Sequence, residues 1–242
     1  MPKTQKQSLI KKNQRKLLII LDFLREFGYT TYMITKDIAW KTVGGLSKPS
    51  KMPCYGFSIP ASKCITGMKL RNVLGSICSK CYALKGRYVF PRVQNALIKR
   101  FNNLNDPNWV ESMAFLINKM EKSGFFRWHD SGDLQSIGHL SRIVEVCKLT
   151  PNTVHWLPTR EYTILSDWKK ANGEFPENLA VRISSLMLEG KPPLAIAERL
   201  GVTTSGVSKE SFDCPAPQQK GKCDNCRACW NRQVANVNYK QH

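Results

Sequence analysis

Four of the nine cysteines lie in one short stretch near the end of the sequence, residues 214–230, which reads CPAPQQKGKCDNCRACW. Three of them are separated by two residues each, a spacing too short for an unstrained disulfide between neighbours. Four thiolates are the usual ligands of a [4Fe–4S] cluster, and a tight run of three with one remote cysteine before a proline suits such a cluster. We therefore expect a [4Fe–4S] cluster, with Arg227 and Trp230 packed beside it, on Cys214, Cys223, Cys226 and Cys229.

Zinc is the alternative metal for this stretch. Zinc sites usually take two separated pairs of ligands, and evenly spaced cysteines match that pattern less well than they match three corners of a cluster. Under this alternative the protein is a zinc-stabilised, basic nucleic-acid-binding protein.

A looser group of cysteines lies in the N-terminal half, where only the last two form a close pair. Paired cysteines in a reduced compartment favour metal binding, so one interpretation is a second metal site, either zinc or all or part of a second cluster. The alternative is that one or two of these cysteines are simply buried small hydrophobic residues. The compact C-x3-C-x2-C loop of radical S-adenosylmethionine enzymes is absent, because Leu74 stands where its first cysteine would be. The members of the group are Cys54, Cys64, Cys78 and Cys81, whereas Cys147 is expected to be a buried free thiol in an apolar helix.

A dense group of charged and polar residues follows the apolar run FFRWH at 125–129. Polar residues at the ends of strands are where barrels place their chemistry, and a histidine beside carboxylates can act as a general base. The alternative is a set of structural hydrogen bonds. The candidate catalytic residues are Arg127, His129, Asp130 and Asp133, and Arg160 and Arg182 after or within later strands are candidate anion ligands.

The formal net charge is +19, from 37 basic and 18 acidic residues. So large an excess predicts a polyanionic partner, either nucleic acid or an acidic protein, although a surface biased toward lysine would give the same balance. No secretory signal follows the basic N-terminus, and no apolar run is long enough to span a bilayer. We expect a cytoplasmic protein that has no membrane contact and keeps its thiols reduced.

Apolar runs alternate with helical segments along the second half of the chain. The runs at 125–129, 153–157 and 179–184 each end in polar residues, and helical patterns follow at 137–149 and 164–171. A short helix at 193–200 precedes a further strand-like run at 202–208. This alternation predicts an α/β fold with a parallel sheet, barrel-like and either full or partial.

The first part of the chain is less regular. Residues 1–12 are expected to be a basic flexible tail, and residues 13–242 a single α/β domain. Helical patterns cover 11–27, 92–103 and 107–123, and residues 29–39 are rich in β-branched and aromatic side chains, which predicts a strand. A Cys-rich insert spans 50–85, and the C-terminal cluster-binding segment spans 212–232.

Residues 194–210 also match a helix-turn-helix superficially. Gly206 would then fall inside the recognition helix, where glycine costs about 1 kcal/mol relative to alanine. The alternation of strands and helices explains the same residues as a helix followed by a strand, and we favour that interpretation.

Several of these motifs together resemble the gene-product-88 family of bacteriophage proteins. They are CSKCYALKGRY at 78–88, WHDSGDL at 128–134, VRISS at 181–185, GVTTSGVS at 201–208, the cysteine stretch at 214–230 and VANVNYKQH at 234–242. The resemblance implies an iron–sulfur-type protein working in an infected host cell, with a barrel-like core similar to that of radical S-adenosylmethionine enzymes. It implies a cluster on the four C-terminal cysteines and supplies no reaction.

These observations favour an iron–sulfur protein for electron transfer, or for an accessory part in a redox reaction with an unknown redox partner. A nucleic-acid-binding protein is the second hypothesis. A radical enzyme with an open cluster on the N-terminal cysteines is the third, and it fits the spacing least well.

Overall fold

A computed structural model describes residues 34–241, and the chain from Lys36 onward belongs to one unit. The expected tail at 1–12 and most of the expected helix at 11–27 and strand at 29–39 lie outside the described residues. The part of 29–39 that is described contradicts the strand, because it enters helix α2 (Lys36–Val43). The reason is local: Ala39 and Val43, one helical turn apart, are both buried, and α2 packs on α5 (Trp109–Met120).

The centre of the fold is a six-stranded sheet in which every neighbouring pair is parallel and the strands follow chain order. The prediction of an α/β fold with a parallel sheet is therefore confirmed. The two edge strands, β1 and β6, do not pair with each other within the described chain, so the sheet is open and not a closed barrel. The strands are β1 (Tyr55–Phe57), β2 (Phe125–Trp128), β3 (Val154–Thr159), β4 (Leu179–Ser184), β5 (Thr203–Ser208) and β6 (Asn236–Lys240).

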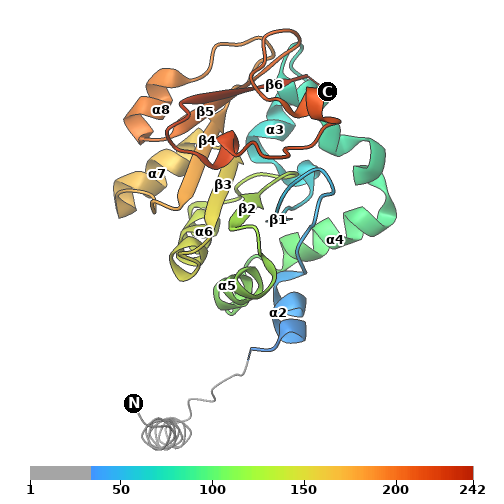
Figure 1. Ribbon diagram of the computed structural model, residues 1–242, viewed down its shortest axis with the longest axis vertical. Coiled ribbons are helices and arrows are strands. Elements are labelled where there is room, and N and C mark those ends of the chain that lie inside the picture. The colour runs from blue at the N-terminus through green and yellow to red at the C-terminus, as the bar shows by residue number, and fades with distance from the viewer. Residues whose placement is uncertain (1–33, 242) are drawn as a thin grey trace, which may run out of the picture. The chain divides into compact units, whose positions relative to one another are not determined.

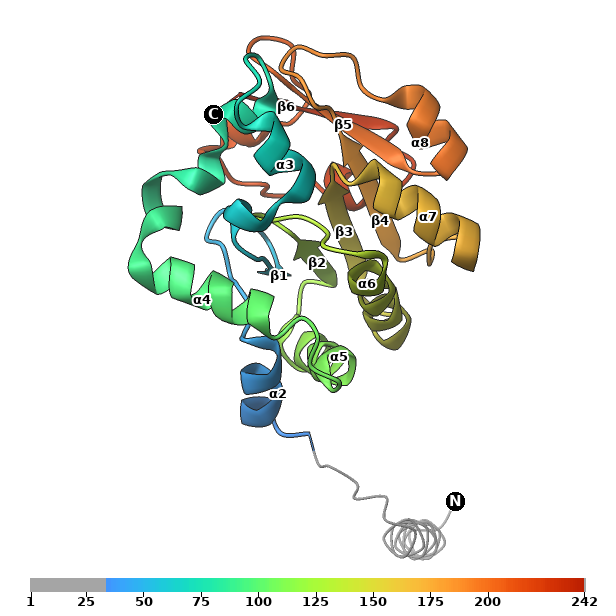
Figure 2. The ribbon, with the colours of Figure 1, turned by 180° about the vertical axis from the view of Figure 1, so that it is seen from behind.

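Helices cover one face of this sheet, as Figure 2 shows. Each connection between β2 and β5 contains one helix, because parallel neighbours need a crossover to bring the chain back to the same end. The helices are α6 (Ile137–Leu149), α7 (Tyr162–Asn172) and α8 (Leu194–Leu200). The helix and strand predicted across 193–208 are both confirmed, and Gly206 lies in β5 and not in a recognition helix.

The connection from β1 to β2 is the longest, and it carries three of the N-terminal cysteines, Cys64, Cys78 and Cys81. It wraps along one side of the sheet before reaching α5 (Figure 2). Its elements are η1 (Ala61–Lys63), α3 (Ile65–Leu70), η2 (Ile77–Lys80), η3 (Tyr82–Leu84), η4 (Gly86–Val89) and α4 (Pro91–Asn102). The stretch expected to be a Cys-rich insert thus also supplies the first strand of the sheet.

The other face of the sheet is covered by the connection from β5 to β6, drawn in red in Figure 1. It contains η5 (Ala216–Gln219) and η6 (Ala228–Trp230) but no α-helix. Because η6 lies against both β3 and β4, the C-terminal cysteine segment packs on what we call the inner face of the sheet.

The core on the helical side is aromatic. Trp128 lies against Phe126, Phe57 and Trp109, with ring centroids 4.9, 6.1 and 6.2 Å away, and all four are fully buried. This core fixes β1 and β2 beside α5. None of the described helices combines the length and the hydrophobicity that crossing a lipid bilayer requires.

Candidate metal centre

The C-terminal cysteine segment is fixed to the sheet by Arg182, whose side chain is fully buried. Its guanidinium donates hydrogen bonds of 2.7 to 3.1 Å to five backbone carbonyls, four of them in or just after η6. Sequence analysis proposed Arg182 as an anion ligand, and its donors are instead used by this loop. The acceptors are the carbonyl oxygens of Thr204, Ala228, Cys229, Asn231 and Val234.

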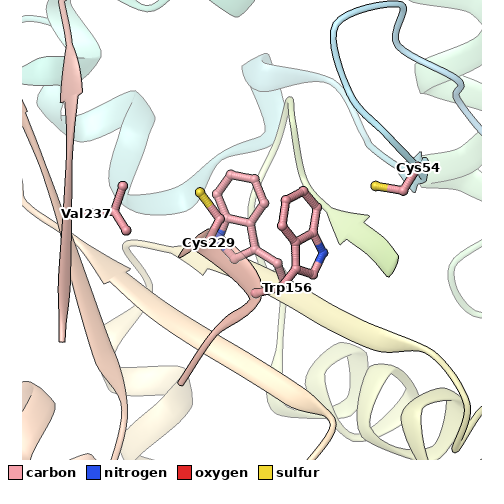
Figure 3. Packing of buried hydrophobic residues seen from close by; sticks show 5 residues of the cluster. Cys54, Trp156, Cys229 and Val237 are labelled. Carbon is pink, nitrogen blue, oxygen red and sulfur yellow. The ribbon is translucent and has the colours of Figure 1, made fainter. Parts of the chain in front are cut away.

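Two tryptophans form the apolar wall of the site. Trp230 packs on Trp156 at 5.2 Å between ring centroids and donates from Nε1 to the Phe126 carbonyl at 2.9 Å. Cys229 and Cys54 belong to the same buried cluster, and Figure 3 shows them on either side of Trp156. The expectation that Trp230 packs near the cysteines therefore matches its position.

The four cysteines of the motif lie close enough to influence one another electrostatically. Burial raises the pKa of Cys223, and Cys214 and Cys226 raise it further. Burial also raises the pKa of Cys229 to about 11, a rise to which Cys214 contributes while the Tyr239 hydroxyl, 3.3 Å from its Sγ, opposes it. Thiols of this kind stay protonated at neutral pH unless a metal replaces the proton.

Cys54 joins this group, although the sequence places it with the N-terminal cysteines. Burial raises its pKa to about 12, with Glu121 and Cys223 adding to the rise. Met52 lies there too, with its Sδ 3.8 Å from the Sγ of Cys223. Sequence reasoning assigned Cys54 to the other cysteine group and did not single out Met52, because only the pairing of β1 with β2 brings residues 52–54 to the inner face.

Three arginines supply positive charge around these thiols. Arg127 stacks on Trp156 at 4.4 Å, and Arg227 lies over Phe125 at 5.2 Å. The Nε of Arg127 is buried without a hydrogen-bond partner, and neither Arg127 nor Arg182 forms an ion pair with a carboxylate in the described part of the chain. A buried Arg182 and a half-buried Arg127 without carboxylate partners leave positive charge here, which favours a negatively charged occupant.

The separation of the thiols bears on which metal fits. Within residues 34–241, no three His, Cys, Asp or Glu side chains converge closely enough to hold a metal ion. A zinc ion needs its sulfurs about 2.3 Å from one centre, hence within about 4 Å of one another. The described side chains therefore form no ready site for a single zinc ion. What the four cysteines do share is a cationic and partly apolar surrounding, which suits thiolate donors.

The remaining three N-terminal cysteines form a separate group. Burial raises the pKa of Cys64, and Asp133, Cys81 and Cys78 raise it further. Cys54 directly precedes β1, whereas Cys64 follows the carboxyl end of that strand. The two cysteines therefore lie at opposite ends of β1.

The four candidate catalytic residues point in different directions. Arg127 faces the C-terminal cysteines, whereas Asp130 accepts a 2.9 Å hydrogen bond from the Tyr88 hydroxyl. His129 is buried on the helical side, 5.4 Å from His139 between ring centroids, and neither of its ring nitrogens has a hydrogen-bond partner. Burial, with His139 adding, holds the pKa of His129 well below its usual value, so this ring is neutral at pH 7.

Asp133 lies in the loop after β2, where its carboxylate is bonded to residues at the carboxyl end of β3. It also raises the pKa of Cys64 in the second cysteine group. Its carboxylate accepts hydrogen bonds from the Leu134 and Arg160 amides at 2.8 and 2.9 Å, and from the Thr159 hydroxyl at 2.5 Å. Burial raises its pKa to about 6, against the effect of these hydrogen bonds. The structure therefore distributes the polar knot over several surroundings and does not gather it into one catalytic site.

Two hollows of about 270 and 260 Å³ lie beside α7, α8 and the beginnings of β4 and β5. Neither is lined by a cysteine or by a residue of the polar knot, so we do not associate them with the candidate chemistry.

Comparison with protein families gives one match, to Gene product 88, over residues 31–232. The chain belongs to the Gene product 88 family. The Gene product 88 match includes all nine cysteines and ends before β6. No curated protein and no solved structure matches the chain.

Proposed function

We propose that this protein is an iron–sulfur protein that acts in the cytoplasm of a phage-infected host cell. The ligands of its [4Fe–4S] cluster are Cys214, Cys223, Cys226 and Cys229. A cluster with four thiolate ligands supplies electron transfer or structural bracing, because no iron is left open to a substrate. The same proposal regards the open sheet as a partial barrel whose inside is filled by the cluster-binding segment.

One observation carries this proposal: the four thiols influence one another's pKa beside the half-buried Arg127 and the buried Arg182, neither of which is paired with a carboxylate among the described residues. Four thiolates outweigh the positive charge of the iron–sulfide core, so the assembly is anionic and would balance Arg127 and Arg182. Trp156 and Trp230 limit water at the site, and the cations favour the reduced state by stabilising the extra electron.

The test is metal and acid-labile sulfide analysis, with absorption and EPR spectra, on protein purified without oxygen. We expect iron and sulfide on the C-terminal ligands, in about four copies of each, lost in Cys223→Ala/Cys226→Ala. Cys147→Ala is the matched control, because Cys147 is a buried cysteine in α6 outside both groups. Stoichiometric zinc without sulfide, or iron unaffected by the double variant, contradicts the proposal.

A second candidate function, nucleic-acid binding, is favoured by the surface of the connection between β1 and β2. No Asp or Glu occurs between Asp37 and Asp106. Large apolar side chains are exposed in the same stretch, including Leu74 at 95% and Phe90 at 58%. Exposed basic residues alternate with them, namely Lys63, Lys69, Arg71, Lys80, Lys85, Arg87, Arg92 and Lys99.

Basic side chains interleaved with exposed aromatic and apolar groups suit single-stranded nucleic acid, whose phosphates need cations and whose bases need stacking surfaces. We expect a fluorescent single-stranded oligonucleotide to bind with an affinity that falls steeply between about 50 and 200 mM salt. Lys80→Glu/Lys85→Glu/Arg87→Glu should weaken binding at least about tenfold and lower the salt slope by roughly 0.7 for each phosphate that is no longer neutralised.

The matched control changes the net charge equally at exposed lysines elsewhere: Lys119→Glu/Lys148→Glu/Lys170→Glu. Equal reductions in affinity in the two triple variants would mean that only the overall charge matters. Binding of an acidic protein without binding of nucleic acid would contradict this second function.

A further inference from the structure

The three cysteines that remain in the N-terminal half meet over the carboxyl edge of the sheet. Cys64 follows η1, Cys78 lies in η2, and Cys81 follows η2. The segment that carries them is tied to the loops after the strands, since Ile59 donates to the Ser131 carbonyl at 3.1 Å and Ile77 donates to the Leu186 carbonyl at 3.0 Å. These ties hold the cysteines where β2, β3 and β4 end.

Gly67 keeps a space open between two of the sulfurs. A side chain at this position would place its Cβ 3.6 Å from the Sγ of Cys64 and 3.6 Å from the Sγ of Cys78. The two sulfurs are therefore no further apart than twice that distance, and they face a common point that only glycine leaves empty. Cys81 lies near both, as the mutual influence of the three thiols indicates.

The carboxylates nearest to this group are already engaged. Glu161 accepts from the amide and the hydroxyl of Thr66, both at 2.8 Å. Asp133 accepts three hydrogen bonds from Leu134, Thr159 and Arg160. Neither carboxylate is available as a fourth ligand without breaking these bonds, so the residues that the structure describes supply three ligands here.

Arg160 brings positive charge to the same place. Burial raises the pKa of the Cys78 thiol, and the Arg160 guanidinium opposes that rise. Arg160 is only partly buried, and its Nε donates to the Ser185 carbonyl at 3.1 Å. Cys64 and Cys81 are also partly exposed, so a small molecule can approach the group from solvent.

We propose that Cys64, Cys78 and Cys81 hold a second iron–sulfur cluster in which one iron has no protein ligand and accepts a small anionic molecule beside Arg160. A cluster suits three thiols better than a single zinc ion does, because a structural zinc site takes four protein ligands and no group of the described side chains is arranged to hold a single ion. The inference does not rest on the C-terminal cluster, since the two groups share no cysteine.

The experiment removes each group separately in the full chain. Cys223→Ala/Cys226→Ala/Cys229→Ala should retain about four irons and four sulfides, and the further change Cys78→Ala should remove them. The reciprocal variant, Cys64→Ala/Cys78→Ala/Cys81→Ala, should lose about half of the iron of the wild type. Cys147→Ala should change neither.

A second variant leaves all the ligands in place. Gly67→Val fills the space between the Cys64 and Cys78 sulfurs, so it should abolish the N-terminal cluster while circular dichroism and the C-terminal iron stay unchanged. Ser62→Val, an exposed residue just outside the group, is the control and should keep both clusters.

The open position is tested with cyanide as a small anionic ligand. In reduced protein that lacks the C-terminal thiols, added cyanide should change the EPR spectrum, and Arg160→Met should weaken this binding several-fold.

A folded C-terminal variant without iron, or Gly67→Val with full iron content, would overturn the second cluster. An EPR spectrum indifferent to cyanide would overturn the open iron. If iron is lost when the C-terminal thiols are removed but not when the N-terminal thiols are removed, the first cluster is supported and the second is contradicted.

Discussion

At the scale of a single residue, Arg127 acts on both a C-terminal cysteine and a tyrosine of the N-terminal half. It stacks on Trp156 on the inner face, and its Nη1 is 3.6 Å from the Sδ of Met52. Burial raises the pKa of both Cys223 and Tyr82, and the charge of Arg127 opposes that rise in each. One guanidinium therefore influences the C-terminal thiols and the tyrosine that directly follows Cys81.

Buried histidines give the protein a dependence on pH. Burial lowers the pKa of His139 to about 4 and that of His155 to about 3, from a usual value of 6.5. The unfolded chain therefore binds more protons than the folded chain between these values. Their contribution to stability is complete above about pH 6.5 and is lost as the pH falls toward 4 and 3.

We expect the free energy of unfolding to fall by about 2 kcal/mol per histidine between pH 7 and pH 5. His139→Phe should remove one of these losses without breaking a hydrogen bond, because neither ring nitrogen of His139 has a partner. Urea unfolding at the two pH values measures the difference. An unchanged pH dependence in the variant would contradict this account.

At the scale of elements, β2 is flanked by two glycines in left-handed conformations. Gly124 precedes the strand with a φ of 77°, and Gly132 follows it with a φ of 82°. A Cβ at Gly132 would lie 2.3 Å from Cγ1 of Ile59 and 2.7 Å from its carbonyl oxygen, whereas at Gly124 the nearest atom is 3.9 Å away. The turn after β2 therefore packs directly on the segment that leads to Cys64.

Replacing each of the two glycines by alanine should separate two contributions to the loss of stability, the strain of a left-handed backbone and the steric overlap of the new Cβ. Gly124→Ala is expected to cost about 1–2 kcal/mol from the left-handed backbone alone. Gly132→Ala adds a clash with the Ile59 backbone, and we expect it to cost about 2 kcal/mol more. Chemical denaturation measures both, and equal destabilisation would show that the Ile59 segment can move aside.

The sequence predicts the repeating elements better than it predicts the pairing of cysteines. Periodicity correctly indicated α4 to α8 and β2 to β5, because each has a helical or strand-like apolar pattern bounded by turn residues. The short strand β1 was missed, because its three residues lie in a stretch rich in Gly, Pro and Ser. Without β1, Cys54 could only be grouped by its distance along the chain, and that grouping differs from the arrangement in space.

At the scale of the whole molecule, the sheet has two unlike coverings. Helices protect one face, whereas the inner face depends on residues 209–235, which contain only the short η5 and η6. The backbone hydrogen bonds within this stretch are local turns, so Arg182, Trp230 and the cysteines supply contacts that hold it to the sheet. Ligands that bridge its cysteines would stabilise it through the folded state alone.

Proteolysis should report this dependence. The segment contains trypsin sites at Lys220, Lys222 and Arg227. We expect iron removal by a chelator to accelerate cleavage here, while the helical side stays intact, as mass spectrometry of the fragments would show. Equal cleavage rates before and after iron removal would contradict a metal-braced segment.

The position of β6 next to β5 has a consequence for biosynthesis. Chains are made from the N-terminus, and their early parts begin to fold first. The strands from β1 to β5 can therefore pair while Trp230 and Val237 are still to be added, and Cys54 and Trp156 remain uncovered during that interval. If the proposed C-terminal cluster is bound, we expect its site to be open to incoming iron and sulfide until the last strand pairs with β5.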